Sequence, residues 1–457
     1  MPVDALRTHV HGLMDRARED LATLVSCRSV ADPRQFPAEE CARAAAFVAR
    51  RFTEAGIPGV RMLATPDGSE AVYGHLPAPP GAPTVLFYSH YDVQPPLDEA
   101  AWTTPVWTLT ERADGRWYGR GAADCKGNIV MQLTALRALA AARGGLEGLG
   151  VGVKIISEGS EEQSTGGLAA FVRANPELLR ADTVMVCDTG NAEAGLPTIT
   201  TDLRGVVHAT VTVRTLAGPV HSGSFGGPTP DPLTALIRML ATLHDATGDT
   251  TVTGLDNSGR WYGAGYPEER YRRDTGVLPG VRLAGSGTVA DMLWARPALT
   301  VVGIDCPPVI GSAPAVQGEV RARLGLRLPH GCDPDRAWRA LKAHLEAAAP
   351  WNAEAEVVCL SHSRPFRSRT DGPAYGRLAK ALQEAFGKET TTTGQGGSIP
   401  TCDALQQTYP HAEIMLVGVE EPRCLIHAPN ESVDPAEIEN MALAQALFLT
   451  GLGEPWS

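Results

Sequence analysis

Residues 84–93 read TVLFYSHYDV, and this stretch decides the fold. Val85 to Tyr88 form a short apolar run of strand-forming residues without glycine or proline, which is typical of a strand buried on both faces. His90 and Asp92 follow at the point where this strand leaves the sheet. Because ligands of open α/β sheets bind beyond the carboxyl ends of the strands, the stretch predicts a polar site at that edge.

The His90–Asp92 pair suits metal binding, because an imidazole can bind a cation through one nitrogen while a nearby carboxylate orients the ring. By itself, however, a histidine beside an aspartate at a strand end is more often a plain hydrogen-bonded pair. The metal interpretation therefore depends on finding further ligands elsewhere in the chain.

Two later strands end in the same kind of residue. The apolar segment 151–157 (VGVKIIS) runs directly into the acidic segment EGSEE at 158–162, and the strand expected at 183–186 is followed by Asp188. A solvated acidic turn is the simpler interpretation of each segment alone. Acidic or imidazole side chains at the same end of three strands favour a divalent cation, which offsets the repulsion among carboxylates.

Asp124 lies in the glycine-rich segment YGRGAADCKG (118–127), just before a helix expected over 128–143. The pattern lacks GxxxxGK[ST], and an aspartate at the loop would repel phosphate, so the segment does not indicate a nucleotide site. Asp124 is therefore either a cap of this helix or a further metal ligand.

Composition restricts the classes of partner. The chain has 457 residues and a net charge of −12, and no basic run with interleaved aromatics is present, which excludes nucleic acid as an expected partner. No apolar run is long enough to span a membrane. The nine cysteines are scattered without CxxC spacing, which predicts free thiols in a reducing compartment, and we expect a cytoplasmic protein. Residues 3–24 are expected to form one amphipathic surface helix rather than a signal peptide.

The chain changes character at residue 202. Strictly alternating segments at 206–214 and 318–328, each followed by a helix, predict a smaller α+β domain inserted at 202–365. Residues 1–201 and 366–457 then form an α/β catalytic domain, with a mixed central sheet flanked by helices. The polar, glycine-rich segment 246–290 shows no clear periodicity and predicts a long excursion.

Seven segments occur in the order found in one family: SHYDVQP, GRGAADCKG, EGSEE, VCDT, GPVHSGSFGG, GGSIP and IHAPNE. With these segments, which span most of its length, the chain resembles the dinuclear zinc hydrolases that include carnosine dipeptidases, succinyl-diaminopimelate desuccinylase and aminoacylase-1. It is most similar to the dipeptidase branch.

The resemblance implies a role for particular residues. One metal ion is held by His90 and Asp188, the other by Glu162 and His427, and Asp124 bridges the two. Asp92 orients His90, Glu161 is the general base, and His221 stabilises the oxyanion, in the family often from the other subunit of a homodimer. The inserted domain is then a lid and dimerisation domain, and a cis peptide bond follows Asp124.

The chemistry of these residue types agrees with the roles. Nitrogen and oxygen ligands suit Zn²⁺, with Mn²⁺ or Co²⁺ as alternatives, and we expect two divalent ions per chain. Two cations that flank one water generate hydroxide near neutral pH, and a carboxylate that is not a ligand must then accept the proton. The expected reaction is cleavage of an amide bond in a small peptide or an N-acyl amino acid.

The chain departs from the family at one point. Dipeptidases of this family usually carry Arg-Glu before GGSIP, where the arginine is expected to bind the free carboxylate of the substrate, but here these positions are Gly394 and Gln395. Arg323 or Arg296 then takes the carboxylate, or the substrate lacks one there. The residues expected to contact substrate are Gly394, Gln395, Gly396, Gly397, Ser398 and Arg323.

Two alternatives stay open on sequence alone. The altered loop is also compatible with a specialised amidase or acyltransferase that acts on a biosynthetic intermediate. A binding protein without catalytic activity on the same fold is the other alternative, although every proposed ligand and the base are present.

Overall fold

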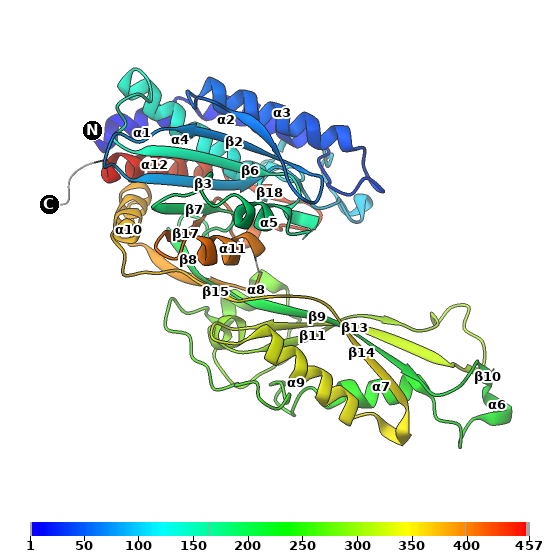
Figure 1. Cartoon of the computed structure of the whole chain (residues 1–457). Coiled ribbons are helices and arrows are strands. Elements are labelled where there is room, and N and C mark those ends of the chain that lie inside the picture. The colour runs from blue at the N-terminus through cyan, green and yellow to red at the C-terminus, as the bar shows by residue number, and fades with distance from the viewer. Residues whose placement is uncertain (1, 164, 398, 454–457) are drawn as a thin grey trace. The chain divides into compact units, whose positions relative to one another are not determined.

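The structure, a computed structural model, describes residues 2–163, 165–397 and 399–453. The chain forms two compact units (Figure 1). Residues 1–201, 368–393 and 399–457 make up the first unit, and residues 202–367 and 394–398 make up the second.

The first unit is built on a mixed sheet whose strands lie in the order β1-β2-β6-β3-β7-β17-β8 (Figure 1). The bounds are β1 Arg61–Ala64, β2 Glu70–Leu76, β3 Thr84–His90, β6 Gly152–Glu158, β7 Thr183–Cys187, β8 Thr198–Leu203 and β17 Glu413–Val417. β3 pairs in parallel with both β6 and β7, and β7 pairs in parallel with β17. The carboxyl ends of these four strands therefore meet at one edge, as the sequence predicts for the first three.

The central strand is buried as its composition predicts. Val85, Leu86, Phe87 and Tyr88 are all inaccessible to solvent, because neighbouring strands and helices cover both faces. The mixed sheet flanked by helices is thus confirmed.

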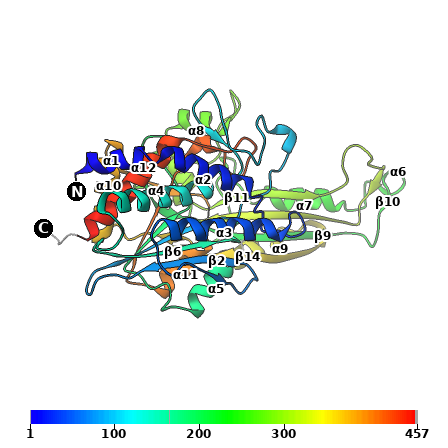
Figure 2. The same ribbon diagram turned by 90° about the horizontal axis from the view of Figure 1, so that it is seen from above.

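Two groups of helices cover the sheet. One face of the sheet shares a continuous apolar core with a group of helices. Figure 2, which looks down on this face, shows these helices gathered over the strands. This group comprises α1 Val3–His11, α2 Met14–Ser26, α3 Ala38–Glu54, α4 Lys126–Arg143, α10 Pro373–Phe386 and α12 Pro435–Leu452. α5 Gly167–Ala174 and α11 Pro400–Thr408 pack together on the opposite face (Figure 1).

The N-terminal helix is not continuous. The single helix predicted over residues 3–24 is wrong, because α1 ends at His11 and α2 begins at Met14. The backbone N–H of Gly12 bonds to the carbonyl of Thr8 at 3.0 Å and closes the first helix, and that of Leu13 bonds to Val10 at 3.0 Å. Glycine is a poor helix former, so the chain turns here at little cost.

α4 passes through the centre of the first unit and is buried almost all round. Leu133, on this helix, is completely inaccessible to solvent. We expect Leu133→Ala to lower the free energy of unfolding by about 2–5 kcal/mol, through lost burial and the cavity left behind. Urea denaturation followed by tryptophan fluorescence measures the change. Leu278→Ala, at a site that is 70% exposed, is the control and should shift stability by less than about 0.5 kcal/mol.

Glu437, in the first turn of α12, carries a pH-dependent contribution to stability. It is 1% exposed and accepts hydrogen bonds from Asn191 Nδ2 and, at 2.6 Å, from the Gly195 N–H. Burial, with a smaller contribution from Asp434, raises the pKa of Glu437 to about 7, against an ordinary value of 4.5. The folded protein therefore binds this proton more tightly than the unfolded chain does.

The stabilisation from this proton is complete below pH 4.5 and is lost as the pH rises through about 7. We expect Glu437→Gln to flatten the decline in unfolding free energy over this range, by a few kcal/mol at most. Thermal or urea unfolding between pH 5 and about 8 checks the difference, with the exposed Glu147→Gln as the control. Parallel stability curves for wild type and Glu437→Gln would contradict the assignment.

The second unit contains a four-stranded antiparallel sheet in the order β11-β13-β9-β14. Its strands are β9 Gly205–Arg214, β11 Ala298–Asp305, β13 Glu319–Leu328 and β14 Glu354–Ser363. The alternating residues of β9 point into a core shared with α7 Pro232–Ala241 and α9 Pro334–Ala347. The predicted α+β composition is confirmed, and the two edge strands β11 and β14 are additional to it.

Shorter elements complete both units. They are β4 Thr110–Glu111, β5 Trp117–Tyr118, β10 Val220–His221, α6 Ser222–Phe225, α8 Glu268–Thr275, β12 Ala315–Val316, β15 Phe366–Arg367, β16 Thr391–Gln395 and β18 Ser432–Val433. α8 lies within the predicted excursion, which has little other regular structure.

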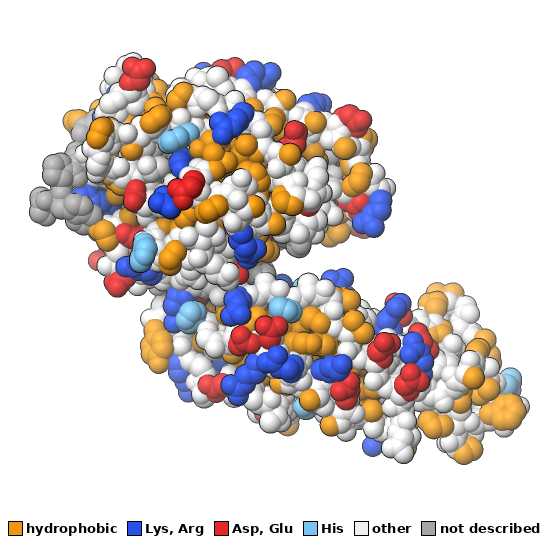
Figure 3. Space-filling view, in the orientation of Figure 1, with side chains coloured by type: hydrophobic (Ala, Val, Ile, Leu, Met, Phe, Trp, Pro, Cys, Tyr) orange, Lys and Arg blue, Asp and Glu red, His pale blue; other side chains and the backbone are white. Residues whose placement is uncertain are grey.

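Surface features agree with the composition. Acidic and basic side chains are interspersed on the face drawn in Figure 3. Within the described residues, no helix combines the length and the apolar character needed to cross a membrane. Each of the nine cysteines is a free thiol.

Candidate active site

The five predicted metal ligands all lie at the carboxyl edge of the parallel strands in the first unit. His90 is the last residue of β3, and Asp188 follows β7 directly. Glu161 and Glu162 begin a short 3-10 turn after β6, Asp124 precedes α4, and His427 lies in the loop before β18. The structure therefore brings together residues that are up to 337 positions apart (427 − 90) in the chain.

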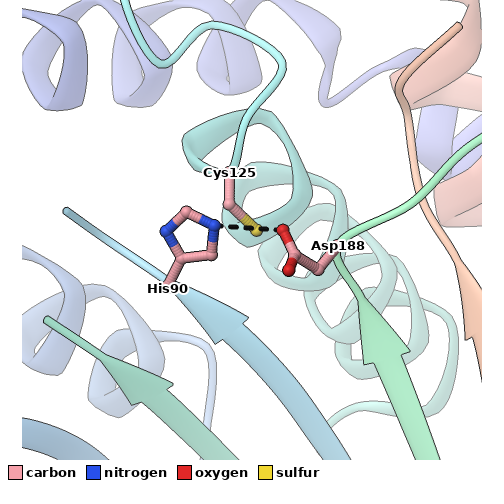
Figure 4. A group of neighbouring side chains, drawn as sticks. All are labelled: His90, Cys125 and Asp188. Atoms are coloured by element: carbon pink, nitrogen blue, oxygen red, sulfur yellow. Dashed lines mark hydrogen bonds and ion pairs between the residues drawn. The ribbon is translucent and has the colours of Figure 1, made fainter. Parts of the chain in front are cut away.

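His90 and Asp188 form one half of the cluster. His90 Nε2 lies 3.0 Å from Asp188 Oδ1 and 3.1 Å from Asp124 Oδ1. Figure 4 shows His90 and Asp188 directed toward each other, with Cys125 beside them. The Cys125 thiol donates a hydrogen bond to the Cys187 carbonyl at 3.0 Å, and burial raises its pKa well above the ordinary value. Because the thiol already bonds to a backbone carbonyl, we assign the donors of this half-site to the imidazole nitrogen of His90 and the carboxylate oxygens of Asp188.

His427 and Glu162 form the other half. His427 Nε2 lies 2.9 Å from Asp124 Oδ2 and 3.3 Å from Glu162 Oε1. Asp124 thus directs one carboxylate oxygen to each half-site, which is the arrangement that a bridging ligand needs. Its backbone leaves by a cis peptide bond to Cys125, as the resemblance implies, and its side chain caps no helix.

Asp92 supports both the histidine and the acidic turn. His90 Nδ1 donates to the backbone carbonyl of Asp92 at 3.1 Å, whereas the nearer carboxylate oxygen is 3.4 Å away. The carboxylate itself accepts the backbone N–H groups of Glu161 at 3.2 Å and Glu162 at 3.0 Å. The orienting contact to the ring is therefore mainly the backbone of Asp92, while its side chain fixes the position of the turn.

Two further carboxylates belong to the site and carried no assigned role in the sequence. Glu431, 1% exposed, accepts the backbone N–H groups of Gly121, Ala123 and Asp124 at 2.9–3.1 Å, and so it holds the loop that presents Asp124. Glu420 is buried and lies close enough to Asp124 and Asp188 to bind the same cation. The motif IHAPNE contains Glu431, but nothing in the residue pattern around Glu420 distinguishes it from an ordinary acidic loop residue.

The cluster has a strongly negative potential. Burial and the carboxylate of Asp188 raise the pKa of Glu161 well above its ordinary value, and burial with Asp124 raises that of Glu162. Burial opposes protonation of His427, but hydrogen bonds to Asp124 and Glu162 raise its pKa to about 11. The pKa values of two carboxyls and of an imidazole are thus all raised. This pattern indicates that the site has an excess of negative charge, which a bound cation would balance.

The side chains present fit a divalent cation at each half-site. Glu162 Oε1 is buried and accepts no aligned hydrogen bond from the described residues. His90, Asp124, Glu162, Asp188 and His427 supply imidazole nitrogens and carboxylate oxygens, which are the ligands that zinc and manganese accept. The side chain of His427 is exposed, whereas the carboxylates of Asp124 and Glu162 in the same half-site are almost completely buried.

The predicted substrate residues lie in the second unit. Gly394 contacts Trp294, and a Cβ atom built at residue 394 would lie 2.5 Å from Trp294 Cγ. This packing leaves no room for the arginine that the family usually carries there. Gln395 ends β16, Gly396 and Gly397 follow it, and Ser398 lies outside the described residues.

Two arginines are candidates to bind the substrate carboxylate in place of the arginine that the family usually carries, and their environments differ. Arg323 is an exposed residue of β13. Arg296 is 5% exposed and already donates to the Gly259 carbonyl and to Ser286 Oγ, each at 3.0 Å. The guanidinium of Arg296 is therefore already bound to groups of its own unit, as expected for a residue that supports the fold.

His221, in β10 of the second unit, is exposed. Its Nδ1 accepts the backbone N–H of Ser224 at 3.1 Å. In the neutral ring this contact puts the proton on Nε2, which leaves a hydrogen-bond donor directed away from its own turn. A donor is what an oxyanion requires.

The fold and the site define a class of protein. A parallel-strand edge that carries two imidazole–carboxylate pairs, a shared aspartate and an adjacent free glutamate has the components of a dinuclear metallohydrolase. The chain belongs to peptidase family M20/M25/M40, whose sequence profile matches residues 86–450. It is therefore an enzyme that hydrolyses peptide bonds with the help of metal, and the predicted class is confirmed.

Several proteins of known activity or structure are similar to this chain. The chain is 42% identical over 446 residues to a cysteinylglycine-S-conjugate dipeptidase of Corynebacterium striatum, covering 96% of each chain. It is 27% identical over 414 residues to the β-Ala-His dipeptidase of Rattus norvegicus, covering 86% of this chain and 81% of the relative. The crystal structure of human carnosine dipeptidase 1 has the same fold, with a TM-score of 0.84, 24% identity and 99% coverage of both chains.

Proposed function

We propose that this chain is a dipeptidase that uses two divalent cations. His90 and Asp188 hold one, Glu162 and His427 hold the other, and Asp124 binds both. The observation that carries the proposal is the placement of Asp124, with its two oxygens 3.1 Å from His90 Nε2 and 2.9 Å from His427 Nε2. Zinc suits this ligand set best, and manganese or cobalt are the alternatives that reconstitution must distinguish.

When bound, the two cations lower the pKa of water and polarise the scissile carbonyl. Glu161 accepts the proton of the attacking water and delivers it to the leaving amine. Its backbone N–H is held by Asp92, which keeps the free carboxylate next to the ligand Glu162. Burial and the nearby carboxylate of Asp188 raise the pKa of Glu161, and the positive charge of bound cations would oppose this rise and keep Glu161 able to accept a proton.

Residues 202–365 act in this proposal as a lid and dimerisation domain, and His221 stabilises the oxyanion from the partner of a homodimer. Mixing two inactive variants tests this arrangement. If His221→Ala and Glu161→Gln subunits exchange, each mixed dimer has one intact site, and activity should return to about a quarter of the wild-type value. A mixture that exchanges subunits and stays inactive would show that His221 does not act across the interface.

The proposed substrate is cysteinylglycine that carries a substituent on sulfur. The dipeptidase of C. striatum, with 42% identity over nearly the whole chain, supports this substrate class. The loop at Gly394 and Gln395 differs from the Arg-Glu of other dipeptidases, which supports a substrate preference different from theirs. The same observation keeps an N-acyl amino acid as the second candidate substrate.

A substrate panel with metal analysis tests the proposal. S-benzyl-Cys-Gly, Cys-Gly, β-Ala-His and N-acetyl amino acids are compared with and without a chelator, and free amino acids are quantified. We expect the S-substituted dipeptide to give the highest kcat/KM and the chelator to abolish cleavage. Preference for N-acetyl amino acids would favour the second candidate, and accumulation of a transferred acyl product would indicate an acyltransferase. Cleavage in metal-free protein would overturn the proposal.

The proposed location is the cytoplasm. Nine free cysteines, five of which are buried, support a compartment that keeps thiols reduced. Fractionation of the source cells, with activity assayed in each fraction, tests the location, and recovery of the activity outside the cells would contradict it.

A further inference from the structure

The second unit contains a cavity of about 600 Å³ that no part of the proposed mechanism uses. It lies between the start of β11 and the excursion that the sequence pattern could not resolve. Its apolar wall includes Met292, Leu293 and Leu299, and its polar wall includes Arg204, Tyr271 and Arg296. This volume and mixture of surfaces are typical of a site for a small molecule.

Arg204 is the unusual member of the polar wall. Its Nε and Nη1 atoms are buried, and neither finds a hydrogen-bond partner among the described residues. Burial and the neighbouring Arg327 lower its pKa to about 10, with only a small opposing contribution from Tyr271. A guanidinium remains charged at this pKa, so a largely desolvated positive charge lies here without an ion-pair partner among the described residues.

Three buried arginines of this chain are paired. Arg116, Arg120 and Arg137 each have a carboxylate oxygen within 2.7 Å, on Glu421, Glu431 and Asp20 respectively. Each of these three arginines also has at least one guanidinium nitrogen that makes no hydrogen bond to the described residues, so an unpartnered nitrogen by itself is not unusual. Arg204 differs from these three in having no carboxylate within ion-pair distance in the part of the chain that the structure describes, and the same holds for the neighbouring half-buried Arg327, which adds positive charge.

The other charges at the cavity do not neutralise Arg204. Asp249 also lines the cavity, but its Oδ1 lies 3.8 Å from Arg296 Nη1 and accepts the Ser286 N–H at 3.3 Å. Its negative charge is therefore balanced by Arg296. The net charge of the two arginines and Asp249 is +1 (2 − 1), which favours an anionic ligand at Arg204.

Arg204 also contacts the loop that differs from the family. Its backbone N–H donates to the Gln395 carbonyl at 3.1 Å, and a Cβ atom built at Gly396 would lie 2.9 Å from Arg204 Nη2. An anion on this guanidinium would therefore bind within reach of residues expected to contact substrate. A glycine at 396 keeps the guanidinium accessible on that side.

We propose that this cavity binds a small molecule with a carboxylate and an apolar body, and that the carboxylate pairs with Arg204. The carboxylate belongs either to the substrate or product of the dipeptidase reaction or to a separate metabolite. In the first case the inference rests on the proposed function. In the second case it describes an independent ligand site that holds the Gln395 loop in place.

Direct titration tests the site without any turnover. The probe is 4-methylpentanoate, and the neutral 4-methylpentanamide of nearly the same shape is its matched control. We expect the acid to bind at least about tenfold more tightly than the amide, because only the acid forms a charge-assisted pair. Isothermal titration with the full chain, with and without zinc, measures both affinities.

Variants identify the residue that binds the acid. Arg204→Gln should weaken binding of the acid by roughly tenfold to a hundredfold, while Arg204→Lys should retain part of it. Arg321→Gln is the control, because Arg321 is exposed and pairs with Asp305 at 2.6 Å. Circular dichroism of each variant separates loss of binding from loss of folding.

Kinetics distinguish the two sources of the carboxylate. If it belongs to the substrate, the acid inhibits competitively, and Arg204→Gln raises KM for a dipeptide but not for its C-terminal amide. If it belongs to a separate metabolite, the acid changes kcat without competing, and Arg204→Gln leaves KM unchanged. Equal affinity for acid and amide, or wild-type affinity in Arg204→Gln, would overturn the inference. Because binding is measured directly, a failure of the proposed dipeptidase activity would leave this test intact.

Discussion

Replacement of Glu161 by glutamine will lower kcat by about 10²- to 10⁴-fold and leave the metal content per chain unchanged. Glutamine has the shape of glutamate but cannot accept a proton from water. The backbone of residue 161 is held by Asp92 Oδ1 at 3.2 Å, so the substitution leaves the turn in place. KM should change little, because Glu161 acts on the water rather than on the bound dipeptide.

The neighbouring Glu162→Gln variant is the matched control for this prediction. It makes the same chemical change one residue further along the same turn, but it removes a proposed ligand. We expect Glu162→Gln to lose one metal ion as well as activity, whereas Glu161→Gln loses activity alone. Metal analysis and steady-state kinetics on both variants separate the two roles. Near-wild-type turnover in Glu161→Gln would show that Glu161 is not the general base.

Replacement of Asp124 by asparagine is expected to have the largest effect on metal binding. Asp124 presents an oxygen to each half-site, at 3.1 Å from His90 Nε2 and 2.9 Å from His427 Nε2. Asparagine keeps one oxygen and loses the charge, so the two cations would repel each other without a shared anion between them. Changes to residues that only orient ligands cost about 10- to 100-fold in affinity, so loss of a bridging ligand should exceed a hundredfold.

Stability provides a second measurement for this variant, independent of activity. Zinc should raise the Tm of the wild-type protein and chelation should lower it, because a ligand that binds only the folded state stabilises it. The Tm of Asp124→Asn should respond weakly to either treatment. The exposed Asp371→Asn variant should respond as the wild type does. Two tightly bound metal ions in Asp124→Asn would contradict the bridging assignment.

Local patterns were sufficient for much of the fold. The apolar run at 85–88 specifies a buried strand because only a covered strand can leave both faces without polar residues. Alternation at 206–214 specifies a half-covered strand for the same reason. The predicted single N-terminal helix failed at Gly12, where one residue of low helix propensity let the chain turn.

Distant contacts could not be read from such patterns. Glu420 joins Asp124 and Asp188 only because the end of β17 lies beside that of β7 in the sheet. Trp294 occupies the space beside Gly394 although a hundred residues (394 − 294) separate them, and nothing in the local pattern of either predicts the contact. Arg204 lies in an ordinary connection between two strands, and only its packing shows that it has no carboxylate partner within residues 2–163, 165–397 and 399–453.

Residue order alone was sufficient for the central buried strand, for the α/β class and for acidic or imidazole residues at three strand ends, because these follow from side-chain type over a few neighbouring residues. The complete set of proposed metal ligands, His427 included, came from the resemblance to the dinuclear zinc hydrolases. Packing decided that the two oxygens of Asp124 lie near two different histidines and that the backbone of Asp92 contacts His90. Packing also left two buried guanidinium nitrogens of Arg204 without a partner among the described residues. Distances and desolvation are properties of packed neighbours, and the chain order does not contain them.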